Sequence, residues 1–317
     1  MEFKGYKKGV NLGGWLSQCC HTKEHYDSFV TEADIKDIAS WGVDHVRLPI
    51  DYNLLEKEDG TPIDSGFDYI DNAVEWCREN GLNIVIDLHK TAGFSFDKGE
   101  NESGFFEDEA LQERFIRLWK RIAERYAVSD STIAFELLNE VTEQKYSSTW
   151  NIVIRRCVDE IHRLAPHNYI LVGGYWQNSP DAIPDLEKPA NDKVVFNFHC
   201  YDPMKFTHQG AYWYEGMDTS FRMKLDECEI KITEEFFLER FARAAETAEK
   251  YGVSLYCGEY GVIDLAEPED ILEWYKAINA AFEKLGISRS AWSYKEMNFG
   301  LSDKRMDGVR EELVKYL

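Results

Sequence analysis

The sequence has no long apolar run and no cysteine pairs at metal-binding spacing. No stretch approaches the roughly 18 apolar residues that a membrane-spanning helix needs, and the start, MEFKGYKK, has no apolar signal segment. The seven cysteines include no CxxC pair, which is typical of a reducing compartment and gives no structural zinc spacing. We therefore expect a cytoplasmic protein without a metal ion or other cofactor. A secreted chain whose signal had been removed would show the same start.

Positive charge is also scarce. The chain carries 36 Lys and Arg against 58 Asp and Glu, a formal net charge of −22. Such a surface repels nucleic acid and anionic membranes, so neither is expected as a partner. It suits a neutral ligand, although an acidic balance is also common among soluble cytosolic proteins. Hydrophobic residues make up 44% of the chain, which is enough for a large core.

What the sequence does contain is a regular alternation of apolar runs and amphipathic segments. Strands are predicted at 9–13, 43–50, 82–89, 133–139, 169–173, 194–201, 253–259 and 290–294. Helices are predicted at 32–41, 67–80, 107–127, 147–165, 180–187, 233–251, 268–285 and 306–317. Repeated βα units with apolar strands predict a (β/α)₈ TIM barrel. A doubly wound sheet is the alternative, but residues 9–14 do not form its glycine-rich phosphate loop.

No Pro- or Ser-rich linker interrupts this alternation, so a single domain over residues 1–317 and a monomer are expected. The segment 202–232, which follows the sixth predicted strand, is too long for a plain βα loop. We expect it to form a lid or wall over the mouth of the barrel.

Polar and aromatic side chains stand where the predicted strands end. They are Arg47, His89, Lys90, Asn139, Glu140, His199, Tyr201, Glu259 and Trp292. Because the carboxyl ends of barrel strands meet at one mouth, two glutamates among them can face each other across a bound sugar. Taken singly, several have structural explanations: His89 and Trp292 could be core residues, and Arg47 could neutralise a buried glutamate. Their joint occurrence at equivalent positions indicates a site.

The ordered set of motifs resembles glycoside hydrolase family 5 of clan A, the retaining β-glycanases on a (β/α)₈ barrel. The matching stretches are NLGGW at 11–15, HVRLP at 45–49, DLH at 87–89, LLNE at 137–140, NFHCY at 197–201, GEYG at 258–261 and AW at 291–292. Within the family the chain is similar to non-secreted clostridial endoglucanases of the C type.

The resemblance implies that Glu140 is the acid/base and Glu259 the nucleophile. Retention needs two carboxyls about 5–5.5 Å apart, one charged and one protonated. Arg47 is expected to hold Glu259 as a carboxylate, whereas burial and the neighbouring anion should keep the proton on Glu140.

Further residues are expected to bind the substrate. By the resemblance, Asn139 donates to the sugar 2-hydroxyl and Tyr201 to the nucleophile. His89 and His199 hold the sugar or the carboxylates in place. Lys90 departs from the family, which commonly has a second histidine there, and this departure is expected to change the sugar specificity.

Aromatic rings in the loops after the strands would stack on pyranose faces. The candidates are Trp15, Phe94, Phe96, Tyr175, Trp176, Tyr212, Trp213 and Tyr214. Trp213 is favoured because the similar endoglucanase has tryptophan in the matching place. Trp292 is expected to form an apolar floor under the ring that is cleaved.

We therefore expect a retaining β-glycoside hydrolase that acts on a neutral β-linked glucan or oligosaccharide, with β-1,4-glucan first. β-1,3-linked or mixed-linkage glucan and β-mannan are alternatives, as is exo action on short imported oligosaccharides. From other classes, a catalytically silent glycan-binding barrel stays open. So does a metal-dependent hydrolase, for which the paired strand-end histidines are lacking.

Overall fold

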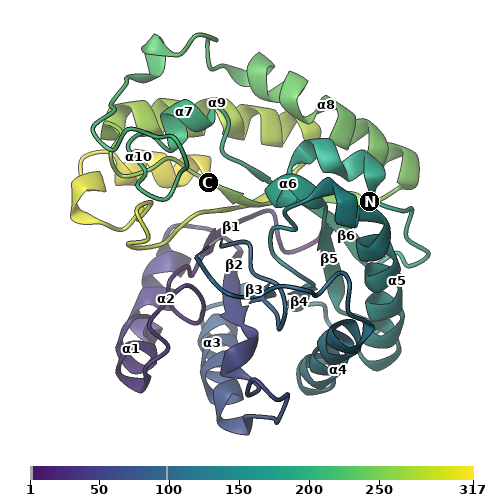
Figure 1. Cartoon of the computed structure of the whole chain (residues 1–317). Helices are drawn as coiled ribbons and strands as arrows, with labels where there is room; N and C mark the ends of the chain where they lie inside the picture. The colour runs from purple at the N-terminus through teal and green to yellow at the C-terminus, as the bar shows by residue number, and fades with distance from the viewer. Residues whose placement is uncertain (1–2, 98) are drawn as a thin grey trace.

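The computed structural model describes residues 3–97 and 99–317, and in these ranges eight parallel strands close into a barrel (Figure 1). The strands are neighbours in chain order, and β8 pairs back onto β1. They are β1 (Lys8–Asn11), β2 (His45–Asp51), β3 (Asn83–Lys90), β4 (Ile133–Glu136), β5 (Tyr169–Gly173), β6 (Val194–Cys200), β7 (Ser254–Tyr260) and β8 (Ser288–Ala291). The predicted (β/α)₈ barrel is confirmed.

Helices lie around the outside of this barrel (Figure 1). The α-helices are α1 (Lys23–Ser28), α2 (Glu32–Ser40), α3 (Phe67–Glu79), α4 (Glu109–Tyr126), α5 (Ser147–Leu164), α6 (Tyr175–Asn178), α7 (Met204–Thr207), α8 (Glu234–Tyr251), α9 (Pro268–Leu285) and α10 (Arg310–Leu313). Short 3₁₀ helices are η1 (Tyr52–Leu54), η2 (Asp64–Gly66), η3 (Gln144–Tyr146), η4 (Pro180–Asp185), η5 (Leu225–Glu227), η6 (Lys304–Met306) and η7 (Val314–Tyr316). Among the described residues no helix combines the length and apolarity of a membrane span.

Three elements in the second half of the chain differ from their predictions. The expected helix at 180–187 is the 3₁₀ helix η4, because Pro184 cannot donate the hydrogen bond that an α-helix needs there. The expected helix at 306–317 is divided among short turns that include α10. β8 begins at Ser288, two residues before the predicted start, and its buried polar residues Ser288 and Arg289 hid it from an apolar pattern.

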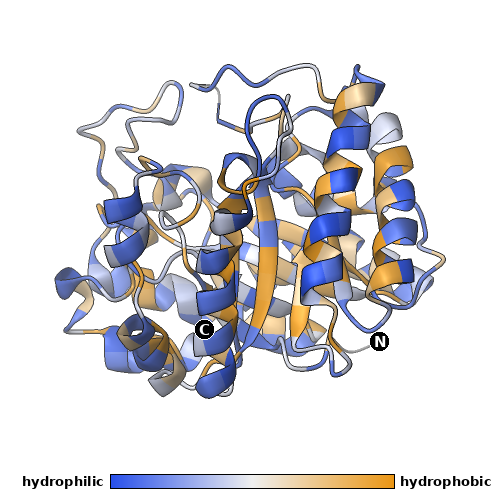
Figure 2. Ribbon diagram, turned by 90° about the horizontal axis from the view of Figure 1, so that it is seen from below, coloured by the Kyte–Doolittle hydropathy of each residue, from blue (hydrophilic) through white to orange (hydrophobic). Residues whose placement is uncertain are grey.

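The barrel interior is apolar at the N-terminal ends of the strands. Figure 2 shows the central strands mainly in orange, while the surrounding helices alternate orange and blue as amphipathic helices do. At the N-terminal ends of the strands, Phe3 stacks on Tyr6 with ring centroids 4.2 Å apart and meets Tyr169 and Tyr256 edge-on. This aromatic cluster closes the end of the barrel opposite to the mouth.

The segment after β6 forms a wall at the mouth, as predicted. It contains α7 and η5 and is anchored by the buried side chains of Phe206 and Ala211. Ala211 packs with Ile263, Trp292 and Phe299, residues that follow β7 and β8. The wall therefore joins the carboxyl ends of the last three strands.

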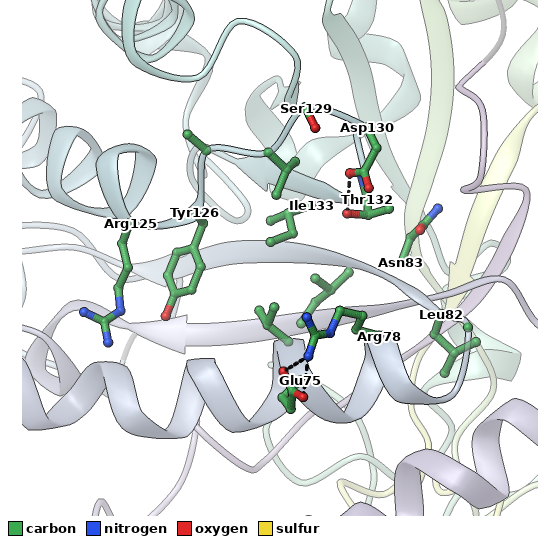
Figure 3. Close-up of a pocket in the computed structure, with 15 residues that line it drawn as sticks. Glu75, Arg78, Leu82, Asn83, Arg125, Tyr126, Ser129, Asp130, Thr132 and Ile133 are labelled. Atoms are coloured by element: carbon green, nitrogen blue, oxygen red, sulfur yellow. Dashed lines mark hydrogen bonds and ion pairs between the residues drawn. The ribbon is translucent and has the colours of Figure 1, made fainter.

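A hollow of about 660 Å³ lies at the other end of the barrel (Figure 3). It is lined by residues that begin β3 and β4, among them Asn83 and Ile133, and by the ends of α3 and α4. Its arginines have carboxylate partners, since Arg78 pairs with Glu75 as Figure 3 shows and Arg125 pairs with Asp71. The hollow is thus remote from the strand ends that carry the predicted site.

Candidate active site

The floor of the mouth is organised around one guanidinium. Arg47 is the third residue of β2 and lies wholly buried inside the barrel, below the strand end where the sequence pattern had placed it. Its Nε and Nη2 donate to Glu136 at 2.7 Å each, and its Nη1 donates to Glu259 at 2.7 Å. Asn11 and Asn139 each accept a further bond at 2.9 Å. Arg47 therefore binds side chains from the three strands β1, β4 and β7 and from the segment that follows β4.

This floor holds more acidic than basic groups. Asp87 Oδ2 lies 3.0 Å from Arg47 Nη2 and 2.6 Å from His89 Nδ1. Burial raises the pKa of Asp87 to about 8 and that of Glu136 to about 7, although the Arg47 charge opposes both shifts. One guanidinium cannot neutralise every carboxyl around it, so the floor retains protons near neutral pH.

Glu259 lies in β7 and both of its carboxyl oxygens have donors. Arg47 Nη1 reaches Oε1 at 2.7 Å, and the Tyr201 hydroxyl donates to Oε2 at 2.8 Å. A cationic donor and a hydroxyl donor together fix the orientation of this carboxyl group. The preceding residue must be glycine, because a Cβ on Gly258 would come within 2.6 Å of Asn197 Oδ1.

Glu140 follows β4 and has an unusual backbone. Its φ of 48° is in the left-handed region, which is uncommon for a non-glycine residue. Burial, with the charge of Glu259 next in size, raises the pKa of Glu140 well above its ordinary value. Glu140 Oε1 lies 2.8 Å from His199 Nδ1, and burial keeps the pKa of His199 well below its usual range, so this imidazole is neutral.

The two glutamates meet at the mouth. One carboxyl oxygen of Glu140, one of Glu259 and a ring nitrogen of His199 all lie within 4.8 Å of one another. This spacing is close to the roughly 5–5.5 Å that separates the two carboxyls of retaining glycosidases, and it is shorter than the gap of inverting ones.

The same three side chains are close enough to bind a metal ion, but the floor opposes one. The Arg47 guanidinium lies 2.7 Å from Glu259, and Tyr201 takes the other oxygen of that carboxyl. A cation would have to displace a hydrogen-bonded cation from its own ligand, so the donor set does not fit a metal centre.

His89 supports Asn139 rather than either glutamate. Its Nε2 lies 3.4 Å from Asn139 Nδ2, and its ring stacks on Trp292 at 5.8 Å with an interplanar angle of 6°. Burial lowers the pKa of His89 to about 4, so the ring is neutral. Since Arg47 binds Asn139 Oδ1, the amide is oriented with its Nδ2 away from the guanidinium.

The rim contains the remaining predicted residues. Lys90, the last residue of β3, donates to Glu100 at 2.8 Å and does not contact the glutamate pair. Trp213 is 44% exposed on the wall, beside Tyr212, which is 78% exposed. Trp176 is 49% exposed where the chain leaves β5.

Other aromatic candidates are buried. Trp15 is only 1% exposed, and Phe94 and Tyr175 are 6% and 4% exposed. Trp15 instead stacks on Trp76 of α3 and donates to the carbonyl of Tyr26. The expectation that Trp15 would stack on sugar was wrong, because this ring packs against Trp76 instead. For Phe94 and Tyr175, sugar stacking stays a prediction.

Four floor residues were not singled out from the sequence. They are Asn11, Asp87, Glu136 and Asn197. A signal existed, because Asp87 and Asn197 stand two positions before His89 and His199 in the same strands, and side chains at i and i+2 share a face. A charged residue inside an apolar strand needs a partner, and the arginine of β2 supplies it.

A parallel eight-stranded barrel with two carboxyls facing each other at its mouth defines an enzyme class, the TIM-barrel glycoside hydrolases. Similarity to known proteins gives the family. The cellulase model of glycosyl hydrolase family 5 matches residues 4–298. Cellodextrinase A of Ruminococcus flavefaciens is 53% identical over 289 residues, which cover 91% of this chain and 85% of that protein.

Two further relatives agree. Endoglucanase C of Acetivibrio thermocellus is 38% identical over 339 residues and 98% of both chains. The crystal structure of the clostridial cellulose synthase subunit Z from Clostridioides difficile superposes with a TM-score of 0.83 at 27% identity, covering 98% of this chain and 99% of that one. The chain belongs to glycosyl hydrolase family 5 and is an O-glycoside hydrolase with a carbohydrate substrate.

Proposed function

We propose that the enzyme hydrolyses β-1,4-linked glucan with retention of configuration, using Glu259 as the nucleophile and Glu140 as the acid/base. One observation carries the proposal: the two carboxyls meet within 4.8 Å, yet they have different surroundings. Arg47 and Tyr201 donate to Glu259, whereas burial raises the pKa of Glu140. The names of the relatives, cellodextrinase and endoglucanase, support β-1,4-glucan as the substrate.

The two steps follow from this arrangement. Glu259 attacks the anomeric carbon while Glu140 gives its proton to the departing oxygen. The Glu259 carboxylate becomes a neutral ester in the intermediate. Its negative charge is one cause of the raised pKa of Glu140, so forming the ester removes that cause. Glu140 is then suited to accept a proton from the water that hydrolyses the ester.

The neighbouring residues position the sugar. Asn139 has its oxygen bound by Arg47 and offers its Nδ2 to the sugar 2-hydroxyl, a bond that strengthens in the oxocarbenium-like transition state. His199 holds the acid/base through its Nδ1. Trp292 provides an apolar floor beneath the ring, and Trp213 on the wall stacks on a further ring.

The same reasoning extends to partners. The net charge of −22 supports a neutral glucan rather than nucleic acid or an anionic membrane. We include in the proposal that the chain acts as a monomer and as a single hydrolase domain, because one barrel supplies every site residue from its strands and from the loops that follow them.

The mechanism is tested by Glu259→Gln and Glu259→Gly. Glu259→Gln should reduce kcat by about 10⁴-fold or more on an aryl β-cellobioside, and azide should restore turnover in Glu259→Gly with an α-glycosyl azide as product. Glu143→Gln is the matched control, because that glutamate lies near Glu140 with 53% of its side chain exposed. Wild-type turnover in Glu259→Gln would contradict the assignment.

The linkage is tested separately with cello-, laminari-, mixed-linkage and manno-oligosaccharides. The highest kcat/KM is expected on the cello series, with the β-anomer formed first. A preference for another series would overturn β-1,4-glucan and leave the two-carboxylate mechanism intact. Tight binding of all series without hydrolysis would indicate a silent glycan-binding barrel, and loss of activity in a chelator would indicate a metal-dependent one.

A further inference from the structure

The short turn α6, which follows β5, has an unusual backbone that the mechanism above does not use. Its residues Trp176, Gln177 and Asn178 have φ values of 53°, 54° and 54°. All three are in the left-handed region, which is unfavourable for residues with a side chain and normally occurs at single positions. Such strain persists only where the surrounding structure holds it, and it is concentrated near functional groups.

Hydrogen bonds to the segment that follows Glu140 hold this turn. The backbone N–H of Trp176 donates to the carbonyl of Thr142 at 3.2 Å. The backbone N–H of Gln177 donates to the carbonyl of Val141 at 3.1 Å. Since these two acceptors come directly after Glu140 in the chain, the strained turn and the acid/base belong to one hydrogen-bonded unit.

Asn178 is the residue that this turn places inside the barrel. Its side chain has no exposed surface, whereas the neighbouring Gln177 is exposed. The amide lies against the backbone of Gly173, the last residue of β5. A Cβ on Gly173 would come within 2.3 Å of Asn178 Oδ1 and 2.7 Å of Nδ2, so only glycine leaves room for the amide. In this position Asn178 Nδ2 lies 3.5 Å from His199 Nε2.

The neutral ring of His199 carries a proton on only one of its two nitrogens. Its Nδ1 lies 2.8 Å from Glu140 Oε1 and 3.6 Å from Glu259 Oε2. In the proposed mechanism Glu259 is a carboxylate, which can only accept hydrogen bonds, so the proton belongs on Nδ1. Nε2 then has a free lone pair, and Asn178 Nδ2 faces it. The hydrogen bond made by one ring nitrogen sets which nitrogen is protonated.

We propose that Asn178 is a positioning residue that fixes the tautomer of His199. Its amide N–H donates to Nε2, the ring proton stays on Nδ1, and Nδ1 donates to Glu140 Oε1. Because Oε1 accepts this bond, the acid proton resides on Oε2, the oxygen that gives it to the leaving group. With the opposite tautomer, Nδ1 would accept the Glu140 proton and direct it away from the substrate. The inference rests on the proposed function, because it requires Glu140 to be the acid/base.

Asn178→Asp tests the tautomer directly. Aspartate has the shape of asparagine and tolerates the left-handed backbone, but its carboxylate replaces the donor with an acceptor. NMR of the enzyme with ¹⁵N-labelled histidine should show the His199 proton on Nδ1 in the wild type and on Nε2 in Asn178→Asp. Gln177→Glu is the matched control, because it adds the same charge at the neighbouring exposed residue and should leave the proton on Nδ1.

The kinetic consequence is a dependence on the leaving group. Phenyl β-cellobioside needs a proton on its departing oxygen, whereas 2,4-dinitrophenyl β-cellobioside releases a stable anion without one. Asn178→Asp should lower kcat/KM about 10²-fold on the phenyl substrate and less than about threefold on the dinitrophenyl one. Asn178→Gly removes the donor without adding charge and is unstrained at this φ. It should show the same contrast, with about a tenfold loss on the phenyl substrate.

The outcomes separate this inference from the proposed function. A proton on Nε2 of His199 in the wild-type enzyme would overturn the inference, as would a ring unchanged in Asn178→Asp. A merely structural role for Asn178 would lower kcat/KM on both aryl substrates together and would also overturn it. If Asn178→Asp does not fold, Asn178→Gly decides alone. Glu140→Gln should lose kcat/KM on the phenyl substrate and retain it on the dinitrophenyl one, and equal losses there would instead contradict the proposed function.

Discussion

The floor beneath the two glutamates and the rim around them are built in opposite ways. On the floor, Arg47, Asp87 and Glu136 have no exposed surface, and the guanidinium binds oxygens from several strands. On the rim, Trp176 and Trp213 keep nearly half of their surface in solvent. The floor is held by charged hydrogen bonds inside the folded barrel, whereas the exposed rings of the rim are expected to be covered by the substrate. We therefore expect the floor to control the chemistry and the rim to control the specificity.

Burying the charged side chains of the floor costs free energy, so substitutions there are expected to have large effects. Charges removed from water are retained only where geometry and hydrogen bonds compensate, and removing one partner leaves the others uncompensated. On the rim, an exposed ring contributes only when a sugar covers it. Substitutions on the floor should consequently affect every substrate and the fold, and those on the rim should affect some substrates only.

The largest effect is expected from Arg47→Lys. A lysine keeps the positive charge. It cannot donate two parallel hydrogen bonds to Glu136 and a further one to Glu259. The free energy of unfolding should fall by about 3–5 kcal/mol, and kcat should fall about 10²–10³-fold on every substrate. Urea unfolding and steady-state kinetics measure both. Arg78→Lys, at a side chain 73% exposed, should change neither. Wild-type kcat in Arg47→Lys would show that the floor does not control the chemistry.

An intermediate effect concerns pH. The pKa of Asp87 is raised from 3.8 to about 8 by burial. Between these values the folded protein keeps a proton that the unfolded chain has lost, so the free energy of unfolding falls as pH rises, and the loss is complete above about pH 8. Asp87→Asn keeps a neutral group there and should flatten this slope. Urea unfolding across the same pH range measures it, and identical slopes in the two proteins would contradict the raised pKa.

The smallest effect is expected from Trp213→Ala. Losing one stacking ring should cost about 0.5–1.5 kcal/mol of transition-state binding, which is roughly threefold to tenfold in kcat/KM on cellotetraose. A short aryl glycoside is expected to end before the wall, so its rate should stay unchanged and serves as the control. An equal loss on both substrates would show that Trp213 affects every substrate, as the floor residues are expected to do, and would contradict its assignment to the rim.

Much of the fold could be predicted from the sequence because parallel strands buried on both faces are apolar along their length. β3, with Ile84, Ile86 and Leu88, is an example. β8 shows the limit, since Ser288, Arg289 and Ser290 are buried in spite of their polarity and are supported by contacts from elsewhere, such as Asn279 to Arg289.

The site was predictable to the extent that strand ends converge in a barrel. The glutamates and their histidine and tyrosine neighbours stand at such ends, and a periodic pattern places them together. The contacts of Arg47 with Asp87 and Glu136 depend on the register between the adjacent strands β2, β3 and β4. The contact of Lys90 with Glu100 depends on the path of a long loop. Neither is encoded in local periodicity.

The aromatic cluster at the closed end of the barrel has a practical consequence. Phe3 is stacked there on Tyr6, and the Leu317 carbonyl accepts from Arg289 near the start of β8. Both ends of the described chain therefore emerge on the side facing away from the mouth. A carrier protein or an immobilisation tag joined at either end would project from the back of the enzyme, and polymer could still approach the catalytic opening freely.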